Sequence, residues 1–199
     1  MNRAASAPHS ATSEPDGRRR RGQDNKARIV AAMLAMVREG DLAPGAEQVA
    51  ARADVGLRTV FRHFQDMDSL YREISASIER ELALVIARPF KAQTWRERLI
   101  EMVARRAAGF EKVLPLQQAA SASRHRSRFL AADHSRRVKL SREVILRQLP
   151  REVAADRALV DALDLLLSVE AWSRLRIEQG LSPKAARETL TAAVGRLIG

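Results

Sequence analysis

The sequence predicts an all-α protein in two parts, a small N-terminal unit of three helices with a helix-turn-helix and a larger helical bundle after it. From about Asp24 onward, apolar residues recur at intervals of three and four, which is the spacing of one face of a helix. The alternation of polar and apolar residues that marks a strand never lasts more than a few positions. A chain of 199 residues, 46% of them hydrophobic, is long enough for both parts.

Residues 1–21 are expected to form a disordered tail, because most of them are small or polar and show no periodicity. The tail ends in a run of arginines. Of these, Arg20 and Arg21 could lie along phosphates or enter a minor groove, and a solvated charge run explains them equally well. Asp24 is the expected cap of the first helix, and Gly40 is its expected end. The inner stripe of this helix consists of Ile29, Met33, Leu34 and Val37.

Two short helices joined by a tight turn are expected between Glu47 and Phe64. Ala50 and Ala53 are small enough for the helices to cross closely, and Val55 can fill the space beneath the turn. Val60 and Phe64 would anchor the second helix on the first. The residues that then project outward are Leu57, Arg58, Thr59, Arg62 and His63. A helix fits the major groove, where arginine pairs with guanine edges and threonine or histidine reaches bases or phosphates.

A long fourth helix follows, and its expected cap is either Asp66 or Asp68. Pro89 is expected to close it. The next helix begins with a capping box in which Thr94 and Glu97 satisfy each other's backbone N–H groups.

Proline and glycine divide the rest of the chain. Pro115 and Pro150 are expected to bracket further helical segments, the second of them rich in arginine. Two last helices are expected, one at about 152–179 and ended by Gly180, the other at about 183–198 and begun by a serine cap with proline in its first turn.

Composition narrows the possible functions. The chain has no cysteine, which excludes disulfides, thiolate metal sites and cysteine nucleophiles. No apolar run approaches the roughly 20 residues that cross a bilayer, and no signal peptide pattern is present, so we expect a cytoplasmic protein without membrane contact. The net charge of +11 favours a polyanionic partner such as nucleic acid. Most of the positive excess lies after residue 72, so charge alone does not locate a binding site.

The helix-turn-helix carries a specific pattern. Its turn reads Val-Ala-x-x-Ala-x-Val from Val49 to Val55, and the run from Thr59 to Phe64 and then Asp68-Ser69-Leu70 follow it. In order and spacing, this pattern resembles the TetR family of bacterial transcriptional regulators, over about Lys26 to Ile74. The resemblance implies an all-α homodimer whose three N-terminal helices bind DNA and whose C-terminal domain binds a small molecule and dimerises through its last two helices.

The segment departs from the family's pattern at four positions. Asp54 stands where glycine is usual, and aspartate tolerates a left-handed backbone better than most residues. Gly56 replaces a common serine. Phe61 stands where tyrosine is usual and Met67 where lysine is usual, so two phosphate contacts are absent. Phe61 is still expected at the DNA interface, and the outward Arg58 and Arg62 are expected to compensate.

Two further features have more than one interpretation. Large apolar residues in the C-terminal half could line an effector pocket or could pack in the core: Trp95, Met102, Phe110, Phe129 and Trp172. The basic stretch from Arg124 to Arg147 could be a solvated face, an anionic effector site or an additional DNA contact.

These observations predict a homodimeric regulator that binds a near-palindromic operator, acts as a repressor and is relieved by a small-molecule effector. The expected units are the tail (1–21), the DNA-binding domain (22–68) and the effector-binding and dimerisation domain (69–199). Two alternatives remain open: an effector-independent DNA-binding or nucleoid-structuring protein, and a helical ligand carrier or enzyme. No catalytic or metal-binding motif is present, so we expect no enzyme activity, cofactor or metal.

Overall fold

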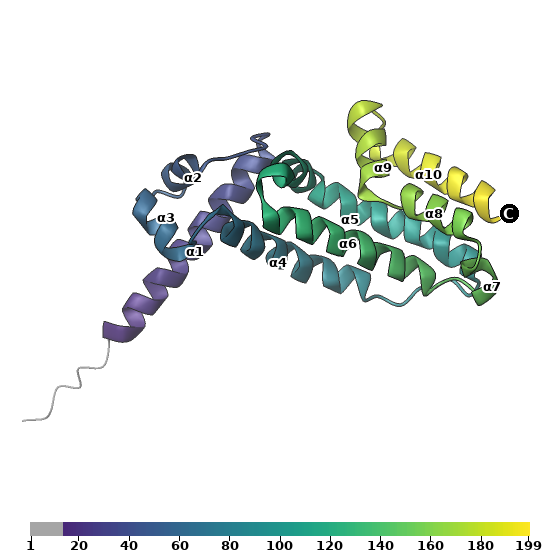
Figure 1. Cartoon of the computed structure of the whole chain (residues 1–199), viewed down its shortest axis with the longest axis horizontal. Helices are drawn as coiled ribbons and strands as arrows, with labels where there is room; N and C mark the ends of the chain where they lie inside the picture. The colour runs from purple at the N-terminus through teal and green to yellow at the C-terminus, as the bar shows by residue number, and fades with distance from the viewer. Residues whose placement is uncertain (1–13) are drawn as a thin grey trace, which may run out of the picture.

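The computed structural model describes residues 14–199, which form an elongated all-α molecule (Figure 1). The helices α1 to α3 lie at one end, α4 runs from them along the bundle, and α8 and α10 lie toward the other end. A 3₁₀ turn occupies Arg124–Arg126, and a π-helical turn occupies Arg174–Glu178. The helices are α1 (Glu14–Arg38), α2 (Ala46–Arg52), α3 (Leu57–His63), α4 (Met67–Ile86), α5 (Trp95–Ser123), α6 (Arg128–Leu146), α7 (Arg151–Ala154), α8 (Arg157–Leu166), α9 (Val169–Ser173) and α10 (Pro183–Ile198). The predicted fold class is confirmed.

The first helix is longer than predicted. It begins at Glu14 and not at Asp24, so residues 14–21, which were expected in a disordered tail, are helical. The sequence contains a start signal that explains this: Pro15 stands in the first turn, where its missing N–H costs nothing. Residues 1–13 of the expected tail lie outside the described part. The end of the helix is confirmed, because Gly40 adopts a φ of 104°.

The cap of α4 is Asp66, whose Oδ1 accepts a hydrogen bond from the Ser69 backbone N–H at 2.8 Å. Asp68 is the other candidate, and it has a different partner. Its carboxylate accepts from Ser127 Oγ at 2.5 Å and from the Phe129 N–H at 3.1 Å. Asp68 therefore ties the first turn of α4 to the first turn of α6.

The Thr94–Glu97 capping box of α5 is confirmed: Thr94 Oγ1 accepts from the Glu97 N–H, and the Glu97 carboxylate accepts from the Thr94 N–H. The expected break at Pro115 is wrong, because α5 continues through it to Ser123. A proline inside a helix loses one hydrogen bond and strains the preceding turn. Leu114 and Leu116, the neighbours of this proline, pack into two separate hydrophobic cores. The free energy of this packing outweighs the cost of the lost hydrogen bond.

The single helix predicted at 152–179 is also wrong. It is broken into α7, α8, α9 and the π-helical turn by two polar caps. Asp156 accepts from the Leu159 N–H and Ser168 accepts from the Ala171 N–H, and such side chains compete with helix continuation. The predicted end at Gly180 is confirmed by its φ of 66°, and Ser182 caps α10 as expected.

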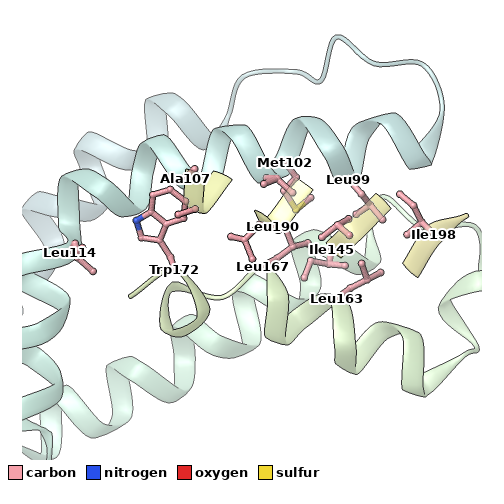
Figure 2. Packing of buried hydrophobic residues seen from close by; sticks show 13 residues of the cluster. Leu99, Met102, Ala107, Leu114, Ile145, Leu163, Leu167, Trp172, Leu190 and Ile198 are labelled. Carbon is pink, nitrogen blue, oxygen red and sulfur yellow. The ribbon is translucent and has the colours of Figure 1, made fainter. Parts of the chain in front are cut away.

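Buried apolar residues form two cores. The first consists of residues from α1, α2, α3 and α4, among them Ile29, Val60 and Leu70, together with Ala119 of α5. The second fills the bundle between α5, α6, α8, α9 and α10 (Figure 2). Trp172 points toward α5 there, and its indole N–H donates to Glu111 at 3.1 Å. None of the helices described within 14–199 is long and apolar enough to cross a membrane.

Candidate nucleic-acid interface and adjoining cavity

The turn between α2 and α3 is held by its backbone and by α1. Asp54 adopts a φ of 50°, the only positive value among the non-glycine residues of 14–199. Arg28 of α1 donates to both the backbone oxygen of Asp54 (3.0 Å) and its carboxylate (3.1 Å). The Val55 N–H donates to the Ala50 oxygen across the turn. Sequence reasoning missed the part played by Arg28, which is separated from the turn by more than twenty residues.

The helix α3 is anchored on one side and exposed on the other. Val60 and the following Phe64 are buried in the first core, as predicted. Arg58 and Arg62 are exposed, and because they are four residues apart they share one face of the helix. The exposed residues Leu57 and Phe61 form the row on one side of these arginines, and the half-buried Thr59 lies on the other side. All six residues predicted in this segment therefore lie on one helix, and four of them are exposed: Leu57, Arg58, Phe61 and Arg62.

His63 does not lie with these four exposed residues. It is half-buried, its Nε2 atom is buried without a hydrogen-bond partner, and its Cε1 lies 3.8 Å from the position that a Cβ on Gly22 would occupy. Desolvation lowers the pKa of the imidazole below its usual value of 6.5, and the nearby charges of Arg62 and Lys26 lower it further. This histidine packs against α1 as a neutral group and is not part of the exposed face of α3.

Arg20 and Arg21 are exposed on the early turns of α1. Because the next residue, Gly22, faces His63 at the end of α3, these arginines lie within about one helical turn of that end. Figure 1 shows α1 extending past α3. Arg21 lies about 100° and Arg20 about 200° around α1 from Gly22, so both arginines are near the end of α3 but on other sides of α1 than the one that meets His63.

A cavity of about 100 Å³ lies where the two parts of the molecule meet. It is lined by Met33 and Val37 of α1 and by residues of α4, α5 and α6. None of the five predicted pocket residues lines it. Met102 and Trp172 are buried in the second core, Trp95 and Phe110 pack against that core, and Phe129 stacks under Arg72, whose guanidinium carbon is 5.0 Å from the ring centroid.

Much of the charge in the basic stretch Arg124–Arg147 is balanced locally. Arg136 and Arg137 contact Asp133, and Arg136 also contacts Glu79 of α4. Further along α6, Arg142 pairs with Asp161 and Asp164 of α8, and Arg147 pairs with Glu143. Four of the eight basic residues in this stretch thus form ion pairs, which favours a solvated, structurally paired face.

Comparison with known proteins supports the fold. A TetR transcriptional regulator from Rhodococcus sp. RHA1 superimposes with a TM-score of 0.56 at 18% identity, covering 88% of this chain and 96% of that one. A TetR-like regulator from the same organism gives 0.52 at 16% identity, covering 88% and 94%. No protein-family model matches the sequence, and no curated protein matches it. The chain therefore has the fold of these TetR-type regulators.

Proposed function

We propose that this protein is a homodimeric, sequence-specific DNA-binding transcriptional regulator that represses its target and is released by a small-molecule effector. The observation that carries the proposal is the pair Arg58 and Arg62, exposed on one face of a short helix whose opposite face is anchored in the core. The shared fold with TetR-type regulators supports the same function.

DNA recognition follows from the chemistry of this helix. With α3 in the major groove, Arg58 and Arg62 donate to guanine edges or phosphates. Leu57 and Phe61, which are 37% and 47% exposed, offer apolar contacts to thymine methyl groups. The basic turns of α1 contact the neighbouring phosphates, which fixes the position of the protein on the duplex.

A single helix of this size reads too few bases for useful specificity, so the proposal includes a dimer formed by α8 and α10. Leu165 of α8 is 66% exposed, although α8 is strongly amphipathic. On α10, Ala192 is exposed and a Cβ added at Gly195 would meet nothing within 4 Å of its own chain, so a second helix can approach closely. A twofold axis there would present two α3 helices to successive major grooves, roughly 34 Å apart.

The cavity supports control by an effector. Its wall combines α1 of the DNA-binding unit with α5 and α6 of the bundle, and α4 connects the two. A molecule that fits the cavity better in one relative placement of these helices would shift the population toward that placement, by as much as its difference in affinity. In a repressor the favoured placement has the two α3 helices at a spacing that does not match the operator.

Selection of bound fragments from a random DNA library tests the proposal. We expect a near-palindromic sequence with half-sites about one helical turn apart or a multiple of it. Arg58→Ala and Arg62→Ala should each weaken binding of that sequence by about tenfold or more. Arg151→Ala changes an exposed arginine on α7 and should have no effect. Equal binding of all fragments would contradict the proposal and favour a nucleoid-type protein.

A further inference from the structure

We infer that the cavity between α1, α4, α5 and α6 binds a small, uncharged, mainly apolar compound of about one ring that carries a single hydroxyl or similar donor-acceptor group. This inference rests on the proposed effector control. It is drawn from the wall of the cavity, which is largely aliphatic: Met33, Val37, Ile74, Ile78, Leu116 and Leu130. Such a lining favours an apolar ligand.

One corner of the cavity is polar. Asp133 lines it with a side chain that is only 2% exposed, and Arg137 lines it as well. Asp133 Oδ2 lies 3.2 Å from Arg137 Nε, yet both atoms are buried and neither makes a hydrogen bond of acceptable geometry. Buried polar atoms in proteins are normally hydrogen-bonded. Because less than 1 Å² of either atom is accessible, a ligand group that both donates and accepts, such as a hydroxyl, would satisfy the two atoms once the Asp133 or Arg137 side chain turns toward the cavity.

The charges of this corner cancel. Arg136 donates to Asp133 at 2.6 Å and also pairs with Glu79, and Arg137 reaches Gln117 at 3.4 Å. Two carboxylates and two guanidiniums thus neutralise each other among the described residues. A ligand carboxylate would be placed against Asp133, and a ligand ammonium against Arg137, so a net charge on the ligand would be desolvated without compensation.

The volume limits the size of the ligand. An engineered apolar cavity of about 150 Å³ in another protein binds benzene. The cavity here is about 100 Å³ and is partly open to solvent, so it can hold one ring whose edge reaches the mouth. A fused-ring or long-chain compound would require the helices to separate.

The ligand class can be tested by thermal unfolding of the full chain with four matched compounds, phenol, toluene, benzoate and benzylamine. Phenol should raise the Tm by roughly 5–10 °C at about a hundredfold excess over its Kd. Toluene lacks the hydroxyl and should bind at least about tenfold more weakly, and the two ions should give no shift. Equal binding of toluene, or stronger binding of benzoate or benzylamine, would overturn the inference.

Variants assign the binding to the cavity. Ala120→Leu fills the cavity from α5 and should abolish the phenol shift, whereas Ala104→Leu, an exposed site on the same helix, should retain it. Asp133→Asn should reduce the preference for phenol over toluene. If Asp133→Asn does not fold, comparison of Ala120→Leu with Ala104→Leu still shows whether phenol binds in the cavity. A phenol shift that survives in Ala120→Leu would refute the cavity as its site.

The test of the ligand class and the test of the proposed function can fail independently of each other. DNA selection with the unliganded protein measures DNA binding, and the thermal shift measures ligand class without DNA. A chain that selects a palindromic sequence but gives no phenol shift would refute only this inference. A chain that binds phenol through the cavity but shows no DNA preference would refute the proposed function.

Discussion

Asp54 holds the turn between α2 and α3 in a conformation that few side chains tolerate. Its φ of 50° lies in the left-handed region, which costs most L-residues about 1–2 kcal/mol. Aspartate tolerates this region better than most residues, as was expected from the sequence. The contact from Arg28 to the backbone oxygen of residue 54 does not depend on the side chain, so it survives substitution there.

Asp54→Val is therefore expected to lower the free energy of unfolding by about 1–2 kcal/mol, because a β-branched residue is strained at this φ. Asp54→Gly removes the strain and loses only an exposed ion pair, so its stability should stay within about 0.5 kcal/mol of wild type. Urea unfolding of the two variants measures the difference. Equal stability of the valine and glycine variants would contradict a left-handed turn.

At the scale of the element, the sequence was most informative where the structure is local. The sequence signals of the α2-turn-α3 unit and of the capping box of α5 each lie within a few positions of one another, and both elements were predicted. The helix expected at 152–179 was wrong because its apolar spacing runs on through Asp156 and Ser168, which act as caps.

The cavity could not be predicted in the same way. Its lining comes from four helices and a loop that are far apart in the sequence, so no single pattern marks it. Trp172 and Met102 were predicted as possible pocket residues because they are large and apolar, but both are buried in the second core. His63 lies on α3, yet its ring turns toward Gly22 of α1, a contact between residues far apart in the sequence.

The two prolines should respond in opposite directions to replacement by alanine. Pro115 lies inside α5, and Pro115→Ala restores a backbone donor and removes a clash, so it should stabilise the fold by about 1–3 kcal/mol. Pro150 precedes α7 with φ −58°, which suits proline. Pro150→Ala should cost roughly 0.4–1 kcal/mol through the unfolded chain. Thermal unfolding compares them, and destabilisation by Pro115→Ala would mean that the bundle requires the proline's local geometry.

At the scale of the whole molecule, the proposed sequence specificity requires two copies of the chain. Leu165→Glu places a charge on the proposed α8 and α10 interface and should weaken the dimer by at least about tenfold, measured by sedimentation velocity. Leu140→Glu is the matched control: it is 45% exposed on α6, about 200° around the helix from Arg142, which contacts α8. Loss of the dimer in both variants, or in neither, would place the interface elsewhere.

The links between α4 and α6 restrict how the molecule can deform. Asp68 joins the beginnings of the two helices, and Glu79 reaches Arg136 eleven residues further along α4, a separation of roughly 16 Å. Sliding one helix past the other would break both links, whereas a tilt of α4 and α6 together as one rigid unit would preserve them. A ligand that entered the proposed effector cavity would therefore be expected to shift α4 and α6 together and not to slide one past the other.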